Sequence, residues 1–478
     1  MHDLLQEMGR EIVRRESPNK IGNRSRLWRH KDVRDTLKHD DGTYTVQGIV
    51  LDLLKIKDIH LSPQAFKKMY NLRFLKFYFG DSPTYELKEQ FWKCVYSGAR
   101  PYNYKVHFPN GMNDFSEKLR SLIWLGYPLT ALPSDFHPEN LVELDMRDKN
   151  LEGLWKNTMD APNLKWLILD DCTRLTKIPD LSDSPLLRVI DLKDCRSLLD
   201  FPQLAQHLKY LHYLDLRGCK SLRSFPSNIH FESLTSLDLH DCNNITKFPE
   251  ISGNITHLDL SGTAIEEVPP SIQSLTKLLR LNLSQCTRLK HICKLESLVE
   301  LNLENCFRLK ICPEILDTVN LLEILNLSGT AIKELPHSIA HLDVLGELHL
   351  RECTNLEMLP SGICNLISRV YLDLTDCPKL EMLPENLGNL WSLKDLLLDR
   401  TSISPLPSTM IHLDGLVKLS CRGCRGLRFS SSSGLPCSLK YLYLSDCNLK
   451  EIPEDIGSLS SLFQLHLSGN DLRVYQKA

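Results

Sequence analysis

The chain has 478 residues and nearly balanced charge, with 57 Lys and Arg against 60 Asp and Glu and a formal net charge of −3. This balance gives no reason to expect nonspecific attraction to nucleic acid or to an anionic membrane surface. No apolar run approaches the roughly eighteen residues that span a bilayer, and the charged start Met1–Arg10 differs from a signal peptide. Composition therefore favours a soluble intracellular protein without a membrane span.

Residues 1–42 stand apart because they lack the leucine repeat of the remaining chain. Apolar residues there follow helical spacing until Ser17-Pro18 ends the first helix, and a second short helix is expected from Lys31 to Lys38. About forty residues cannot bury two such faces alone, so this segment should pack on another part of a larger protein. The first apolar face consists of Met1, Leu4, Leu5, Met8, Ile12 and Val13.

A leucine pattern returns every 20 to 24 residues from Leu144 almost to the C-terminus, which is the signature of a leucine-rich-repeat solenoid. Strands of similar character begin upstream at Leu51, Phe74 and Leu122, so residues 43–478 should form about eighteen repeats. The regular repeats begin their strands at Leu144, Leu167, Ile190, Leu214, Leu237, Leu258, Leu281, Leu301, Leu325, Leu348, Leu372, Leu396, Leu419, Leu442 and Leu465.

Within each repeat, Leu-x-Leu alternation places both leucines on the core side of a short strand and the intervening residue on the other side. A Leu-Pro step or an equivalent follows in most repeats, as at Leu335-Pro336. Proline opposes a continued ladder, so the return limb should be irregular or one turn of helix. A single repeat cannot bury its apolar face, but stacked neighbouring repeats bury these faces against one another. The expected fold is an α/β leucine-rich-repeat solenoid, a curved horseshoe with parallel strands on its concave face.

Three segments interrupt the regular pattern. Residues 80–118 stretch the interval from Phe74 to Leu122 to 48 residues and are rich in aromatics. This insertion is either a contact loop or an ordered flap over the early repeats. Residues 430–433 should form a mobile loop on the outer limb. The interval 281–301 lacks the Leu-Pro step, so the local curvature should change there.

Ten of the sixteen cysteines occupy one position of the repeat, so their spacing follows the solenoid and not a pairing scheme. A small side chain there must turn into the core and satisfy backbone groups, which Asn does strongly and a thiol weakly. We expect reduced, structural cysteines and no metal site. Cys421, in a Cys-x-x-Cys pair, replaces a strand leucine and should be core. The ten are Cys172, Cys195, Cys219, Cys242, Cys286, Cys306, Cys353, Cys377, Cys424 and Cys447.

The residues before, between and after the strand leucines should point to the concave side. The middle position carries mostly Asp and then Asn from Asp145 to Asn326, which many leucine-rich repeats share. Departures from this consensus introduce aromatic and arginine side chains, the types that dominate interface energetics. They indicate a protein-recognition face, with scattered surface aromatics as the alternative. The departures are Trp166, Ile168, Tyr213, Arg217, His349, Arg351, Tyr371, Tyr441 and Tyr443.

Three N-terminal stretches resemble a known family: Met1-His2-Asp3-Leu4-Leu5, Ser25-Arg-Leu-Trp28 and Val46-Gln-Gly-Ile-Val-Leu-Asp-Leu53. With the repeats at 258–269 and 325–336, they are similar to plant intracellular immune receptors of the nucleotide-binding, leucine-rich-repeat type. The subclass resembled carries a Toll/interleukin-1-receptor-like (TIR) N-terminal domain. By this resemblance, residues 1–42 are a helical remnant of the winged-helix (ARC) part of the nucleotide-binding (NB-ARC) region, and residues 43–478 are the leucine-rich-repeat domain. We expect the chain to be truncated at both ends.

In that family a Met-His-Asp motif ends the nucleotide-binding region, and its histidine approaches the phosphate end of ADP. The resemblance thus assigns His2, supported by Asp3, to ADP or ATP contact in an intact receptor, at a helix N-terminus that favours anions. The sequence given contains no Gly-x-x-x-x-Gly-Lys-Ser/Thr phosphate loop and none of the family's NAD-cleaving domain. We therefore expect no cofactor and no catalysis of this chain by itself.

The resemblance implies the ligand-sensing and autoinhibitory region of a plant immune receptor in the cytoplasm or nucleus. Its expected partners are a pathogen effector or a guarded host protein, and the receptor's own nucleotide-binding domain. One alternative is the substrate-binding arm of a ubiquitin ligase, which would have longer repeats without the Leu-Pro step. A standalone leucine-rich-repeat scaffold is another. An extracellular ectodomain would instead show a signal peptide and paired capping cysteines.

Overall fold

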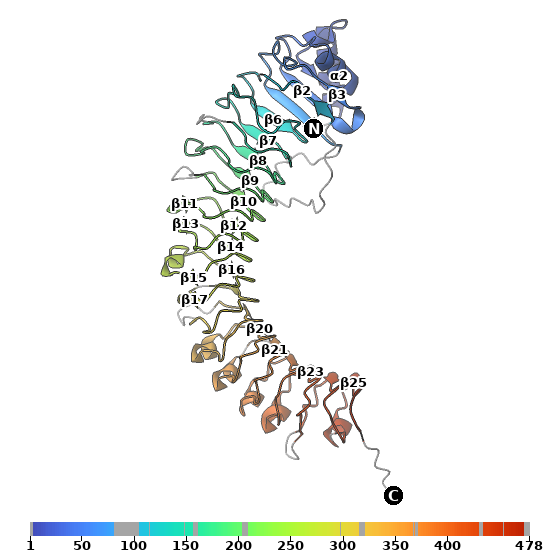
Figure 1. The fold of residues 1–478 in the computed structure, drawn as a ribbon. Coiled ribbons are helices and arrows are strands. Elements are labelled where there is room, and N and C mark those ends of the chain that lie inside the picture. Colours follow the sequence, from blue (N-terminus) through green and yellow to red (C-terminus); the bar gives the residue numbers. More distant parts are fainter. Residues whose placement is uncertain are drawn as a thin grey trace. The chain divides into compact units, whose positions relative to one another are not determined.

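The computed structural model describes residues 3–80, 105–113, 115–147, 149–155, 161–202, 209–296, 298–314, 321–366, 368, 371–429, 434–452 and 454–472. These residues form two compact units, Met1–Leu237 and Asp238–Ala478. Each unit is a stack of leucine repeats with its own ladder of parallel strands (Figure 1). The expected mobile loop at 430–433 and most of the insertion lie outside the described residues.

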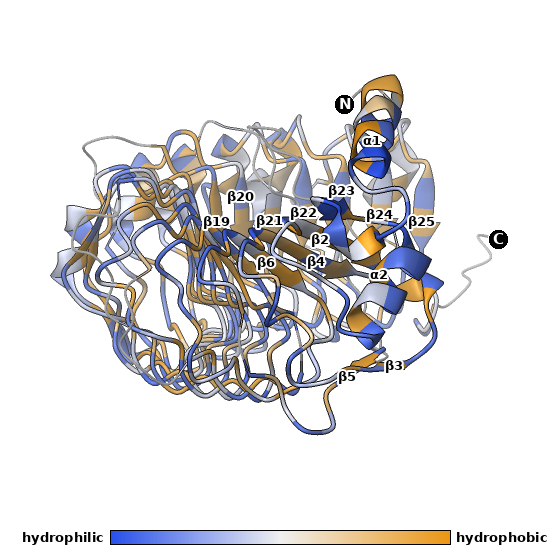
Figure 2. Cartoon of the chain, turned by 90° about the horizontal axis from the view of Figure 1, so that it is seen from above, coloured by the Kyte–Doolittle hydropathy of each residue, from blue (hydrophilic) through white to orange (hydrophobic). Residues whose placement is uncertain are grey.

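The N-terminal segment of the first unit is partly integrated into the repeats. It contains α1 (Asp3–Glu16), η1 (Ile21–Asn23), β1 (Arg26–Leu27) and α2 (His30–Lys38). Strand β1 pairs with the first repeat strand, and α2 buries Val33 and Leu37 completely. Helix α1 leaves its apolar face open, since Leu4, Leu5, Met8 and Ile12 are 55–64 % exposed (Figure 2). The two helices are confirmed, and a separate domain at 1–42 stays a prediction.

The repeat strands of the first unit pair in parallel from each repeat to the next. Short accessory elements η2 (Leu53–Lys55), β3 (Ile59–His60), β5 (Val106–His107) and β11 (Ile229–Phe231) lie between them. Strand β12 (Ser236–Asp238) lies at the boundary of the units. The ladder strands are β2 (Gly48–Asp52), β4 (Phe74–Tyr78), β6 (Ser121–Trp124), β7 (Glu143–Asp145), β8 (Trp166–Ile168), β9 (Val189–Asp191) and β10 (Tyr213–Asp215).

The second unit continues the same pattern with three-residue strands. Its strands are β14 (His257–Asp259), β16 (Arg280–Asn282), β18 (Glu300–Asn302), β19 (Ile324–Asn326), β20 (Glu347–His349), β21 (Tyr371–Asp373), β22 (Asp395–Leu397), β23 (Lys418–Ser420), β24 (Tyr441–Tyr443) and β25 (Gln464–His466). Its accessory strands are β13 (Ile251–Gly253), β15 (Glu267–Val268) and β17 (His291–Ile292).

The return limbs of the second unit carry short 3-10 helices, as the proline steps predict. Four of them follow a capping proline: Pro269, Pro336, Pro360 or Pro407. The proline fixes extended backbone there and ends any ladder, after which one turn brings the chain back to the next strand. The helices are η3 (Pro270–Ser274), η4 (His337–His341), η5 (Ser361–Asn365), η6 (Leu387–Asn389), η7 (Ser408–His412) and η8 (Glu454–Ser458).

All eighteen predicted strand positions lie in strands, but two were assigned to the wrong register. Ile49 and Leu75, not Leu51 and Phe74, align with Leu122 across the sheet. Phe74 is 47 % exposed, whereas Ile49 and Leu75 are fully buried. In β4 the apolar residues occupy both faces of the strand, so the pattern within one repeat could not decide between them. In β2, Leu51 shares the buried face with Ile49, and the assignment was shifted by two residues along that face.

The described end of the insertion is an ordered flap. Strand β5 pairs with β3, and both Phe108 and Phe115 are buried against Trp124, at ring-centroid distances of 6.2 and 6.4 Å. The contact-loop alternative falls on aromatic residues between 81 and 104, which lie outside the described residues.

The cysteines that recur at one position of the repeat, here called the ladder cysteines, donate their thiol protons to backbone carbonyls, as expected for this position. The Cys353 thiol donates to the carbonyl of Leu327, one repeat earlier, at 3.2 Å, and Cys377 does the same with Leu350 at 3.1 Å. Asn470 occupies the equivalent position and makes four backbone contacts, two as donor and two as acceptor. The cysteines of this ladder are buried and free, as is Cys421. Their structural role is confirmed.

Candidate protein-binding site

The outer face of each sheet, opposite the leucine core, carries the predicted contact residues. From β7 to β10 of the first unit the middle position is closed: Asp145, Asp191 and Asp215 are 3–5 % exposed and Ile168 is 1 % exposed. Longer side chains at flanking positions cover these short ones. Ile168 is therefore a buried packing residue and offers no surface to a partner, which corrects its inclusion among the contact residues.

Tyr213 and Arg217 lie together over Asp215, and both bind it. The Tyr213 hydroxyl donates to Asp215 Oδ2 at 3.0 Å, and Arg217 Nε donates to Asp215 Oδ1 at 3.0 Å. Burial and the nearby carboxylates raise the pKa of Tyr213, so its hydroxyl stays a neutral donor. Trp166, two strands away on β8, is partly exposed. These three predicted residues thus lie on the outer face, with two of them held by a carboxylate.

The outer face of these strands also carries a row of carboxylates that outnumber the nearby cations. The sequence alone did not distinguish this row from the Asp residues that are common at the middle position of leucine-rich repeats. Arg147 Nε lies 3.0 Å from Asp145 and 2.9 Å from Asp170. Burial, followed by the charges of Asp170 and Asp215, raises the pKa of Asp191 to about 8. Burial likewise raises the pKa of Asp170 to about 6. Asp191 is thus largely protonated at neutral pH.

In the second unit the predicted residues His349 and Arg351 line a polar recess of about 460 Å³, and the predicted Tyr371 lies against His349. The His349 ring lies 5.1 Å from the Tyr371 ring, and its Nε2 lies 3.1 Å from Glu347 Oε2. Partial burial and the carboxylates of Asp373 and Asp395 raise the pKa of Tyr371 to about 12. The recess is lined by Glu304, Asn305, Asn326, Ser328, Gly329, His349, Arg351, Glu352 and Asp373.

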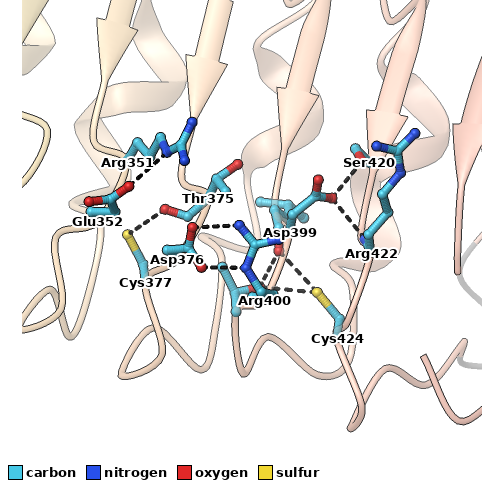
Figure 3. A network of polar contacts seen from close by, with 12 residues as sticks. Arg351, Glu352, Thr375, Asp376, Cys377, Asp399, Arg400, Ser420, Arg422 and Cys424 are labelled. Carbon is cyan, nitrogen blue, oxygen red and sulfur yellow. Dashed lines mark hydrogen bonds and ion pairs between the residues drawn. The ribbon is translucent and has the colours of Figure 1, made fainter. Parts of the chain in front are cut away.

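Several residues that line the recess were not predicted as contact residues, because the pattern within one repeat does not show which residues of neighbouring repeats lie side by side. Glu304, Ser328 and Arg351 hold the same position in three successive repeats, two residues after the middle one. Aligning the repeats on their strands would have placed them side by side. Figure 3 shows the adjoining contacts, in which Arg351 binds Glu352 and Arg400 reaches Asp376 of the preceding repeat.

Tyr441 and Tyr443 lie on β24, farther along the outer face of the same unit. The Tyr443 hydroxyl donates to Gln464 Oε1 at 2.9 Å, and the Arg422 guanidinium lies 4.2 Å from the Tyr443 ring centroid. Tyr441 approaches Phe463, with ring centroids 6.0 Å apart. Both tyrosines are partly exposed, as expected for contact residues.

A Ser-His-Asp grouping near β14 lacks the geometry of a nucleophile. His240 Nδ1 lies 2.7 Å from Ser261 Oγ, but Ser261 donates its proton to Asp259. Ser261 is also only 2 % exposed, so a substrate carbonyl could not reach it. Among the described residues, no group of three His, Cys, Asp or Glu side chains is placed to hold a metal ion. The predicted His2 lies outside these residues, as does the side chain of Asp3.

Comparison with known proteins agrees with this architecture. A family model described as Leucine Rich Repeat matches residues 438–459. The chain is 35 % identical to the disease resistance-like protein DSC1 of Arabidopsis thaliana over 99 % of its own length and 34 % of that protein. Over almost all of its length the chain is therefore similar to part of a plant disease resistance-like protein.

Two further relatives from Arabidopsis thaliana support this similarity. The disease resistance protein RPS6 is 34 % identical over 74 % of the chain and 34 % of the relative. The disease resistance protein RPS4 is 36 % identical over 74 % of the chain and 30 % of the relative. The chain thus spans about a third of the length of these relatives. None of the helices described has the length and hydropathy required to cross a membrane.

Proposed function

We propose that this leucine-rich-repeat region senses a protein ligand and holds a plant immune receptor inactive in its absence. Its partners would be a pathogen effector or a guarded host protein, together with the receptor's own nucleotide-binding domain. Its place of action would be the cytoplasm or the nucleus. The observation that carries the proposal is the recess lined by His349 and Arg351, with Tyr371 beside His349, in a chain similar to plant disease resistance proteins.

The chemistry of the recess suits protein recognition. Arg351 and His349 each lie beside one glutamate, while Glu304 and Asp373 add further negative charge to the lining. A partner's basic or amide side chain would find acceptors there and an aromatic ring beside them. The repeat fold itself is a scaffold, which agrees with a binding role. The relatives are resistance proteins, which supports this role over that of a ligase arm.

The test uses the intact receptor gene from which this chain derives, expressed in leaf tissue. Alanine at His349, Arg351 and Tyr371 should abolish the pathogen-dependent response if the recess binds the ligand. It should cause a response without pathogen if the recess binds the receptor's own domain. Met382→Ala is the matched control, because Met382 is 70 % exposed on a return limb of the same unit. An unchanged response in both conditions, at equal protein levels, would refute the proposal.

The nucleotide contact of His2 and Asp3 is a separate proposal that rests on the family resemblance. It applies only to the intact receptor, in which ADP or ATP would be held by a phosphate loop elsewhere. His2→Ala in that protein should accelerate release of bound ADP, and unchanged release would refute the assignment.

A further inference from the structure

A cluster of cations and aromatic rings covers the outer face of the last strands of the second unit. We call it the basic aromatic face and define it by Lys394, Lys418, Arg422, Lys440, Tyr441 and Tyr443. The strand register aligns Asp395, Lys418 and Tyr441 in one row and Leu397, Ser420 and Tyr443 in the next. Lys394 and Lys440 precede the strands β22 and β24 directly. Lys418, Tyr441 and Tyr443 thus lie on adjacent strands, and Lys394, Lys440 and Arg422 flank the strands β22, β24 and β23 at their ends.

The cations of this face are not neutralised by carboxylates. Over the described part of the chain, Lys394, Lys418, Arg422 and Lys440 make no ion pair with an acidic side chain. Elsewhere on the unit, comparable cations are paired, as Arg400 is with Asp376 and Lys290 with Glu266. The basic aromatic face therefore keeps an excess of positive charge in a chain whose formal net charge is −3.

Three carboxylates lie near this face, but they leave its charge uncompensated. Asp395 lies in register with Lys418 on the neighbouring strand. The carboxylate of Asp399 accepts from the Ser420 hydroxyl and from the backbone N–H of Arg422, so it is committed to the turn (Figure 3). Asp373 lies in the row of Leu397, Ser420 and Tyr443, one strand farther away. Four cations against these three carboxylates leave a local excess that a partner's acidic groups would meet.

The aromatic rings hold the cations in place before any partner arrives. The Arg422 guanidinium lies 4.2 Å from the Tyr443 ring centroid, and Lys418 Nζ lies 5.9 Å from the same centroid. The Tyr443 hydroxyl is fixed in turn by its bond to Gln464. A preordered arginine loses less side-chain freedom on binding than a mobile one, and Tyr and Arg are the side chains that most often dominate binding energy.

We propose that the basic aromatic face docks an acidic segment of a partner protein, in which Asp or Glu side chains flank an apolar or aromatic residue. Carboxylates would bind Arg422 and Lys418, and the apolar residue would pack on Tyr441 and Tyr443. A nucleic acid fits less well, because carboxylates are interspersed among only four cations and would repel a run of phosphates. This inference rests on the proposed function and names the chemistry of one partner.

Fluorescence anisotropy with the full chain tests the proposal. The probe is a short labelled peptide of alternating Glu and Asp with a central tyrosine, compared with a lysine-rich peptide of the same length. We expect binding of the acidic peptide only, weakening as salt is raised. The double substitution Lys418→Glu and Arg422→Glu should raise the Kd at least about tenfold, a change of about 1.4 kcal/mol. Tyr443→Ala should weaken binding less, and Tyr443→Phe least, because Phe keeps the ring.

Lys277→Glu is the matched control, since Lys277 is an exposed lysine on a return limb of the same unit. Circular dichroism checks that each variant is folded. Equal binding by wild type and the double variant would overturn the proposal. So would a single-stranded oligonucleotide that binds more tightly and displaces the peptide. If the peptide fails while the recess variants still alter the receptor response, only this inference falls; the reverse outcome refutes the proposed function alone.

Discussion

Asp191→Asn should stabilise the first unit at neutral pH, although it removes a charge that recurs at this position in several repeats. The carboxyl group of Asp191 is 3 % exposed, and its neighbours on the outer face include Asp170 and Asp215. For an acid whose pKa is raised on folding, the stabilising contribution is complete below the unfolded value, about 3.9. It is lost as the pH rises toward the folded value of about 8.

The magnitude follows from the size of that shift. One unit of pKa corresponds to about 1.4 kcal/mol. At pH 7 only the part of the rise between 3.8 and 7 counts, about three units, so the upper limit is about 4 kcal/mol. Proton sharing with the neighbouring carboxylates lowers the gain below this limit. Asparagine avoids the loss because it carries no charge, and its Oδ1 can still accept the Lys193 N–H that Asp191 binds at 3.2 Å.

Urea unfolding of wild type and variant at pH 5 and pH 8 measures the effect. Tryptophan fluorescence reports mainly on the first unit, which contains Trp166 and all the other tryptophans except Trp391. The advantage of Asp191→Asn should grow from pH 5 to pH 8. Asp259→Asn is the control and is followed by circular dichroism, since Asp259 lies in the second unit. Asp259 makes the same contact to a backbone N–H but is partly exposed and binds the Asn282 amide. A difference that is equal at both pH values would refute the reasoning.

Three further predictions concern the repeat framework. Cys353→Ala removes the thiol donor to the Leu327 carbonyl, which keeps the Thr330 N–H and hydroxyl as donors, and should lower the free energy of unfolding by about 1 kcal/mol, measured by denaturant titration; no change would show that the thiol bond is dispensable. Iodoacetamide should modify exposed Cys437 well before the buried ladder cysteines, as read by mass spectrometry, and equal rates would contradict their burial. Gly262→Ala should cost about 1–2 kcal/mol, because Gly262 has φ +70° and its Cβ would meet Asp241 Oδ1 at 2.7 Å. Gly153→Ala, with open space around it, should be neutral.

Much of the fold could be predicted from the sequence because the solenoid is built from local periodicity. Leu-x-Leu alternation, the proline step and the cysteine position each recur every repeat, so the strands, the return limbs and the thiol ladder were all located correctly. The periodicity failed only where a strand is longer than three residues, as at Phe74. There, two apolar faces compete, and pairing with β6 decides that Leu75 is the core residue.

The candidate sites depend on contacts between repeats, which a single repeat cannot specify. Ile168 and His349 hold the same repeat position, yet Ile168 is buried and His349 is partly exposed, because the side chains on adjoining strands differ in length. The raised pKa of Asp191 and the unpaired charge of Arg422 likewise arise from neighbours about one repeat away. In the three-residue strands, the sequence by itself determined which residues face the core. Only the tertiary structure decided which outward residues are covered, charged or open, since that depends on how the repeats stack.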